Sequence, residues 1–246
     1  KVKSAMTYPI IVMFVAVVII IGLVTFILPS FMQLFVDLEV KHFPITTTLL
    51  MAFSKFLTTK WYIMIAGLVI FTMAFRMFIK TDVGRRAYDR FKLKAPVFGS
   101  LNHKIALSRF AQTLSTLLAS GVPILSAMET VAGTVNNDII SEAILTARAR
   151  IREGDRIGDP LQKSKLFPPM VVQMISIGEE AGALDAMLGK VADFYEAEVD
   201  AALDSLTSAI EPVLIVFLGF AVGFIVISVF MPLMTVISTL SGGEGG

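Results

Sequence analysis

Residues 167–232 read FPPMVVQMISIGEEAGALDAMLGKVADFYEAEVDAALDSLTSAIEPVLIVFLGFAVGFIVISVFMP, which joins an acidic helical segment to an uncharged apolar run. Apolar side chains recur in the first part at three- and four-residue steps, on one stripe of an α-helix. They are Leu184, Leu188, Val191, Tyr195, Val199, Leu203 and Leu206. Residues 213–231 then carry no charge, and about 20 apolar residues cross a bilayer. The stretch therefore predicts a polar helical domain joined to a membrane anchor through one continuous helix.

The composition indicates a membrane protein with several spans. Of the 246 residues, 55% are hydrophobic, and the mean hydropathy is strongly positive. The chain has 21 Lys and Arg against 20 Asp and Glu, so its bulk charge does not favour nucleic acid as a partner. Cysteine is absent, which excludes disulfides, thiolate metal sites and cysteine nucleophiles.

Three apolar runs predict three transmembrane helices. Residues 1–29 hold the end of a preceding domain and the first of these helices, which Pro29 ends. Residues 61–80 form the second helix, and residues 209–240 form the third. Arg76 lies in the last turn of the second helix, where it either snorkels to the interface or marks a transport pathway.

Basic residues after the second apolar run set the predicted orientation. The basic side chains of this segment are Lys80, Arg85, Arg86, Arg90, Lys92 and Lys94, against only Asp82 and Asp89. The positive-inside rule places them in the cytoplasm. Residues 30–60 then form a periplasmic or extracytoplasmic connector, whose part 45–57 is apolar enough to lie along the membrane surface. The C-terminus, with a flexible tail at residues 241–246, lies outside.

Residues 81–208 predict a cytoplasmic helical domain. Helical periodicity or capping residues favour helices at 105–119, 124–135 and 139–152, and another that opens at Pro168 and Pro169 and ends around 178–182. Residues 154–160 are predicted to be a turn. Amphipathic helices bury their stripes on one another. The expected fold class is therefore all-α, an integral membrane protein with three transmembrane helices and one cytoplasmic antiparallel helix bundle.

An internal repeat indicates a duplication. Residues 4–12 read SAMTYPIIV and residues 208–216 read SAIEPVLIV, and a second proline follows each first one at the same distance, at Pro29 and Pro232. Because the third apolar run follows a cytoplasmic domain, we expect that the first does too. Lys1 is then not the natural start, and a similar domain precedes it.

Motifs of enzymatic chemistry are missing from the sequence. It contains no GxxxxGK[ST], HExxH or GxSxG pattern, so no catalytic or cofactor-binding residue and no enzyme activity is predicted. His42 and His103 fall on opposite sides of the membrane in the predicted topology and cannot share a metal. Glu179 and Glu180 are either solvated acids at a helix end or, with Asp185, a cation site, and no metal residue is assigned.

Carboxylates on the helix of residues 184–206 are the better candidates for a binding surface. Asp193, Glu196, Asp200 and Asp204 lie opposite the apolar stripe. They form either a plain solvated surface or a docking strip for basic residues of a partner or a second copy. Glu211, just before Pro212, is either an interfacial acid or the partner of a basic side chain on a neighbouring helix.

Three segments resemble the type II secretion F and type IV pilus platform family. They are residues 121–133 (GVPILSAMETVAG), 167–200 and 211–232. The run IGEE-x-G-x-LD-x-ML-x-K-VADFYE-x-EVD is most similar to the pilus assembly platform branch, and SAMTYP at residues 4–9 resembles the join between the first family domain and its span. The family carries two homologous cytoplasmic domains, of which this chain holds the second.

The resemblance implies a multipass protein of the bacterial cytoplasmic membrane that works as an adaptor. Its expected partners are a hexameric assembly or retraction ATPase, pilin or pseudopilin subunits, other inner-membrane assembly proteins, the lipid bilayer and further copies of itself. The residues hypothesised to bind partners are Glu179, Glu180, Asp193, Glu196, Asp200, Asp204, Glu211, Pro212, Arg85 and Arg86.

Three other functions compete with a pilus platform. A type II secretion platform shares the same motifs and is the first alternative. A transporter fragment would carry polar groups at mid-membrane depth, whereas only Thr25, Thr72, Ser228 and the terminal Arg76 interrupt the apolar runs. A membrane-anchored enzyme has no motif in its favour.

Overall fold

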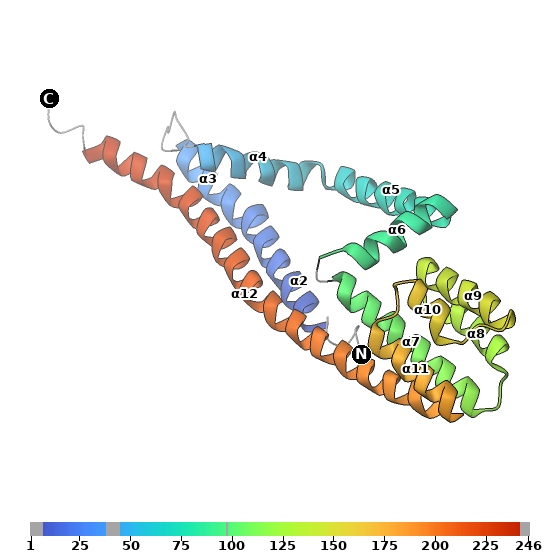
Figure 1. Ribbon diagram of the computed structural model, residues 1–246. Helices are drawn as coiled ribbons and strands as arrows, with labels where there is room; N and C mark the ends of the chain where they lie inside the picture. The colour runs from blue at the N-terminus through green and yellow to red at the C-terminus, as the bar shows by residue number, and fades with distance from the viewer. Residues whose placement is uncertain (1–6, 38–44, 97, 242–246) are drawn as a thin grey trace. The chain divides into compact units, whose positions relative to one another are not determined.

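The computed structural model describes residues 7–37, 45–96 and 98–241, and every element in these ranges is a helix (Figure 1). The described residues hold three helical stretches long and apolar enough to cross a membrane, Thr7–Phe31, Trp61–Lys80 and Leu184–Met231. The predicted all-α fold with three helices able to span a membrane is thereby confirmed for the described residues, and the cytoplasmic antiparallel bundle stays a prediction. Residues 242–246 of the predicted tail lie outside the described residues.

The chain divides into two units. Unit 1 comprises residues 1–73 and 207–246, and unit 2 comprises residues 74–206. Helix α12 (Leu184–Ser241) is continuous and contributes residues to both units, as the sequence of its two halves predicts.

Unit 1 contains the first apolar helix, which does not end at Pro29 as expected. It continues from α2 (Thr7–Gly22) through a π-helical turn, η1 (Leu23–Ile27), into α3 (Leu28–Asp37). The N–H of Leu28 donates to the carbonyl of Leu23, five residues back. A wide turn of this kind accommodates a proline that an α-helical turn would exclude, so the helix passes Pro29.

Helix α4 (Ile45–Thr59) packs on this first helix through a hydroxyl group. The carbonyl of Val24 lacks a backbone donor, because Leu28 N–H is bonded to Leu23 and Pro29 has no N–H. The buried Ser54 Oγ donates to that carbonyl at 2.7 Å. Val24, Leu28 and Leu50 form a small apolar core at the same place.

The opposite end of α4 makes the same kind of bond to α12. Pro232 cannot donate to the carbonyl of Ser228, four residues earlier in the helix. Thr47 Oγ1 of α4 is fully buried and donates to this carbonyl at 2.7 Å. Two prolines therefore each free a carbonyl, and two hydroxyls of one helix satisfy both. No pattern in the sequence predicted this pairing.

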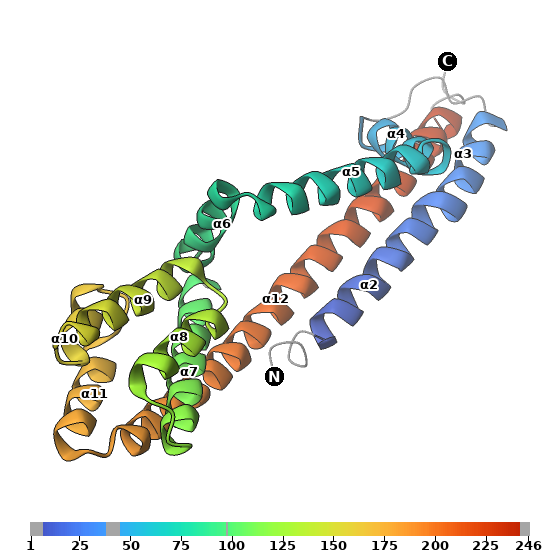
Figure 2. The same ribbon diagram turned by 90° about the vertical axis from the view of Figure 1, so that its right-hand side faces the viewer.

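Unit 2 gathers its helices around one hydrophobic core (Figures 1 and 2). After the end of α5 (Trp61–Lys80) come α6 (Asp82–Lys94), α7 (Phe98–Ala119), α8 (Ile124–Thr134), α9 (Asp138–Arg152), α10 (Gly158–Lys163), α11 (Pro169–Ala181) and the start of α12. Phe110 is fully buried and meets Phe167 edge to face at 5.0 Å between ring centroids. The predicted stripe on α12 is buried from Leu188 to Leu206, and Leu184 is half-buried.

Helix α10 begins inside the segment predicted to be a turn. The carboxylate of Glu179 in α11 accepts the N–H of Ile157 at 2.9 Å and satisfies a donor at the start of α10. Gly158 lies so close to α11 that a Cβ there would fall 2.5 Å from Ser176 Oγ. Both contacts come from a helix further along the chain, so the local sequence carried no signal for α10.

Candidate functional site

Helix α6 carries most of the predicted basic cluster and follows the end of α5 after a tight turn. Thr81 caps α6 by accepting the N–H of Gly84 at 3.2 Å. A Cβ on Gly84 would overlap the carbonyl oxygen of Phe78, so this turn requires glycine. Phe75 of α5 and Tyr88 of α6 meet edge to face at 5.9 Å. The turn therefore fixes α6 directly beside the last residues of an apolar helix.

A buried polar network attaches α6 to the start of α9. Asp89 is only 4% exposed, and its Oδ2 accepts the N–H of Asp138 at 2.9 Å. Asn137 donates to the carbonyl of Asp89 at 3.3 Å and caps α9 by accepting the N–H groups of Ile139 and Ile140. Asn137 therefore caps α9, the helix that the sequence predicted at residues 139–152. Its link to Asp89 was not predicted, because no local pattern joins two residues so far apart in the chain.

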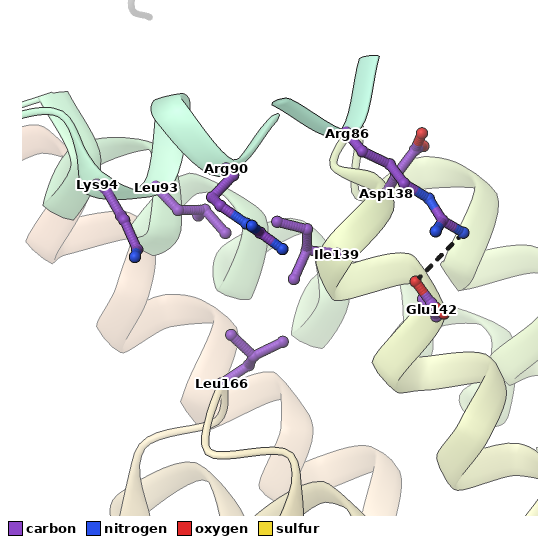
Figure 3. Close-up of a pocket in the computed structure, with 8 residues that line it drawn as sticks. All are labelled: Arg86, Arg90, Leu93, Lys94, Asp138, Ile139, Glu142 and Leu166. Carbon is purple, nitrogen blue, oxygen red and sulfur yellow. Dashed lines mark ion pairs between the residues drawn. The ribbon is translucent and has the colours of Figure 1, made fainter. Parts of the chain in front are cut away.

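A cavity of about 440 Å³, the α6 pocket, opens where α6 meets α9 (Figure 3). Its lining comes from α6, α9 and the loop before α11. The lining residues are Arg86, Arg90, Leu93, Lys94, Asp138, Ile139, Glu142 and Leu166. Figure 3 shows Arg90 extending from α6 toward Ile139, while Leu166 rises toward the cavity from the opposite side.

Positive charge exceeds negative charge in the α6 pocket. Arg85, just outside the lining, pairs with Asp138 at 2.6 Å, and Arg86 lies 3.8 Å from Glu142. Within the described part of the chain, no carboxylate lies within ion-pair distance of Arg90 or Lys94. The two acids of the pocket are thus engaged, and these two cations remain available to an anionic ligand.

The predicted site residues Arg85 and Arg86 therefore lie at this pocket, and two further residues of the same cluster join them. Arg86, Arg90 and Lys94 follow one another at four-residue steps, which places them on one face of α6. This four-residue spacing was the feature of the sequence that could have identified the three residues as one group. The partner acids on α9 could not be anticipated from it.

The predicted acidic strip, Asp193, Glu196, Asp200 and Asp204, lies on unit 2. Asp193, Glu196 and Asp204 are exposed, and Asp200 is half-buried. Glu198 of the same helix instead pairs with Lys104 of α7 at 2.6 Å and joins α12 to the domain core. Three of the four acids of the strip thus lie at the surface.

The structure brings Glu179 and Glu180 into contact with the loop before α10. Glu179 is half-buried and binds the N–H of Ile157, and Glu180 pairs with Arg156 at 2.8 Å. Among the described residues, no group of three His, Cys, Asp or Glu side chains is placed to hold a metal ion. The local chemistry of both acids is therefore that of fold-stabilising groups.

Glu211 and Pro212 lie in α12, within unit 1, and both are exposed. Among the described residues, none forms an ion pair with the Glu211 carboxylate. Pro212 cannot donate to the carbonyl of Ser208, so α12 loses one backbone bond there. Glu211 thus lies next to a helical turn that lacks one backbone hydrogen bond.

Three helices of the described chain that are apolar enough to span a membrane, together with a helical domain that carries charged surfaces, define the class of an all-α membrane protein. The family model of type II secretion system protein F matches residues 110–232, half of the chain, and the chain belongs to this family. The match covers most of unit 2 and the apolar part of α12.

Similar curated proteins fall into two groups by name. The chain is 47% identical to the type IV pilus assembly protein PilC of Thermus thermophilus over 98% of its length, and 43% identical to the protein of that name from Myxococcus xanthus over 96%. It is 33% identical to a type II secretion system protein F of Aeromonas hydrophila over 95%. It spans 59%, 56% and 60% of these relatives, respectively.

Proposed function

We propose that this chain is part of the membrane platform of a type IV pilus assembly machine. The observation that carries the proposal is the difference in identity: 47 and 43% to relatives named for pilus assembly, against 33% to a relative named for type II secretion. A type II secretion platform is the second candidate, because the family model itself bears that name. The domain has no motif for nucleotide hydrolysis, so a separate ATPase supplies the energy.

The proposed location is the bacterial cytoplasmic membrane, with residues 81–208 as a cytoplasmic bundle. The basic residues of α6 support this orientation, because they follow the second apolar helix directly. The connector of residues 30–60 and the C-terminus then lie outside. The domain limits predicted from the sequence remain part of this proposal.

The proposed mechanism transmits motion of a hexameric ATPase along α12. The ATPase acts on the 81–208 domain, and α12 carries the displacement into its apolar part, beside which pilin subunits enter or leave. The continuity of the helix from Leu184 to Ser241 supports this proposal. Pro212 removes one helical bond where the apolar part begins, so we propose bending at this turn.

The acidic strip is the proposed ATPase-docking surface. Reversal of charge at Glu196, Asp200 and Asp204 to lysine is expected to weaken capture of the ATPase at least tenfold. Opposite charges that attract a basic partner surface then repel it. The measurement uses the whole chain in detergent with the assembly and retraction ATPases of the same cell, at low and high salt, since screening reduces such attraction.

A matched variant carries the same change at Glu129, Glu153 and Asp159, which are exposed acids of unit 2 outside the strip. This matched variant should capture the ATPase as strongly as the unaltered chain does. Equal loss in both variants, or no loss in either, would contradict the strip as docking surface. Failure of the unaltered chain to bind any pilus ATPase would contradict direct coupling through this chain.

A further inference from the structure

We propose that the α6 pocket binds the phosphate of an anionic membrane phospholipid. The proposal rests on the membrane assignment of α5 and is independent of whether the machine builds pili or secretes proteins. It therefore concerns a ligand that neither the family nor the relatives' names specify.

The charge of the pocket selects an anion. Arg90 and Lys94 line the cavity, and the described chain offers neither of them a carboxylate within ion-pair distance. A guanidinium group binds phosphate oxygens through two parallel N–H bonds, and a lysine ammonium adds a compact charge. Arg90 and Lys94 lie one turn apart on α6 and line the same cavity, so both contribute positive charge to it.

The position of the pocket selects a lipid over a free ion. Lys80 ends a helix that is apolar enough to span a bilayer, and α6 begins at Asp82. The contact between Phe75 and Tyr88 holds α6 beside the last turns of that helix. Clusters of Lys and Arg that directly follow a membrane helix bind anionic lipid headgroups. The α6 pocket is thus within reach of a phosphate that stays in the membrane.

The remaining walls fit the rest of such a ligand. Leu93, Ile139 and Leu166 supply an apolar side that suits the glycerol backbone and the first carbons of an acyl chain. A volume of about 440 Å³ falls within the size range of small-molecule sites. An acidic peptide would need an extended groove of several residues, so a compact cavity lined by eight residues favours a headgroup.

The acidic residues of the α6 pocket influence its affinity for the phospholipid. Glu142 lies 3.8 Å from Arg86, a long ion pair that holds the arginine at the rim. Neutralising Glu142 would release Arg86 toward the cavity and remove a negative charge from its lining. We therefore expect Glu142→Gln to strengthen phospholipid binding about threefold, a gain that loss of fold could not produce.

The test is native mass spectrometry of the whole chain in neutral detergent, titrated with phosphatidylglycerol or phosphatidylcholine. We expect one tightly bound phosphatidylglycerol and a preference of at least tenfold over phosphatidylcholine. The double variant Arg90→Ala with Lys94→Ala should lose that preference. A matched double variant, Arg109→Ala with Lys163→Ala, removes two exposed cations of unit 2 outside the pocket and should keep it.

Three results would overturn the proposal. They are equal affinity for the two lipids, an equal loss in the matched double variant, and tighter binding of inorganic phosphate than of phosphatidylglycerol. The last result would assign the pocket to a free phosphate. An unchanged affinity in Glu142→Gln would contradict the role of the Arg86 pair.

Discussion

Replacement of Asp89 by alanine is expected to lower the free energy of unfolding of unit 2 by about 2–4 kcal/mol. Its carboxylate is nearly inaccessible and receives the N–H of Asp138 and the ammonium of Lys92, at 2.9 and 3.3 Å. Removal of the acceptor leaves the Asp138 N–H unpaired at the start of α9. It also removes one of the contacts between α6 and α9, while the bond from Asn137 to the carbonyl of residue 89 and the Arg85–Asp138 pair remain.

Hydrogen exchange of the whole chain in detergent, combined with denaturant unfolding, measures this effect. Exchange should rise most at the first turn of α9, where the amide of Asp138 loses its acceptor. Asp89→Asn keeps an oxygen acceptor but loses the charge that faces Lys92. It should therefore lower the free energy of unfolding clearly less than Asp89→Ala does. Equal exchange in Asp89→Ala and in the unaltered chain would show that other contacts hold α6 to α9.

Loss of the two α4 hydroxyls that bond to other helices' carbonyls, in Thr47→Val with Ser54→Ala, is expected to destabilise unit 1 by about 2–5 kcal/mol. Each change leaves one buried carbonyl without a donor, that of Ser228 or that of Val24. Within an apolar environment, water cannot replace the lost bond. The measurement is the unfolding free energy of the full chain in mixed micelles.

Thr58→Val is the matched control, because Thr58 Oγ1 bonds only to carbonyls of its own helix, those of Ser54 and Lys55, at 3.0 and 3.3 Å. A double-mutant cycle gives the sharper result. In Pro232→Ala, the restored N–H can bond to the carbonyl of Ser228, so Thr47→Val should then cost much less. Equal costs in the two backgrounds would contradict the role assigned to Thr47.

Periodicity in the sequence predicted those features of the fold that arise within one helix. The stripe from Leu188 to Leu206 repeats at helical spacing, and its burial follows from that repeat. Asn137 stands before an apolar-periodic segment and caps it, as its residue type favours. Gly182 ends α11 in the left-handed conformation that glycine adopts readily.

The features that the sequence did not predict depend on pairs of distant residues. The carboxylate of Glu179 binds the N–H before α10, and the carboxylate of Asp89 is one of the groups that join α6 to α9 beside the α6 pocket. The passage of the first helix through Pro29 needs a π-helical turn, which leaves no mark in hydropathy. In the basic cluster, the spacing of Arg86, Arg90 and Lys94 indicated one face of a helix, but not which acids would meet it.

The hydroxyls of Thr47 and Ser54 have a consequence for the order in which the chain matures. During synthesis the first apolar helix and α4 emerge early, and Ser54 can satisfy the carbonyl of Val24 at once. The carbonyl of Ser228 emerges much later, when Thr47 of α4 is already in place to donate to it. We therefore expect the third apolar helix to dock on a part of unit 1 that is already formed.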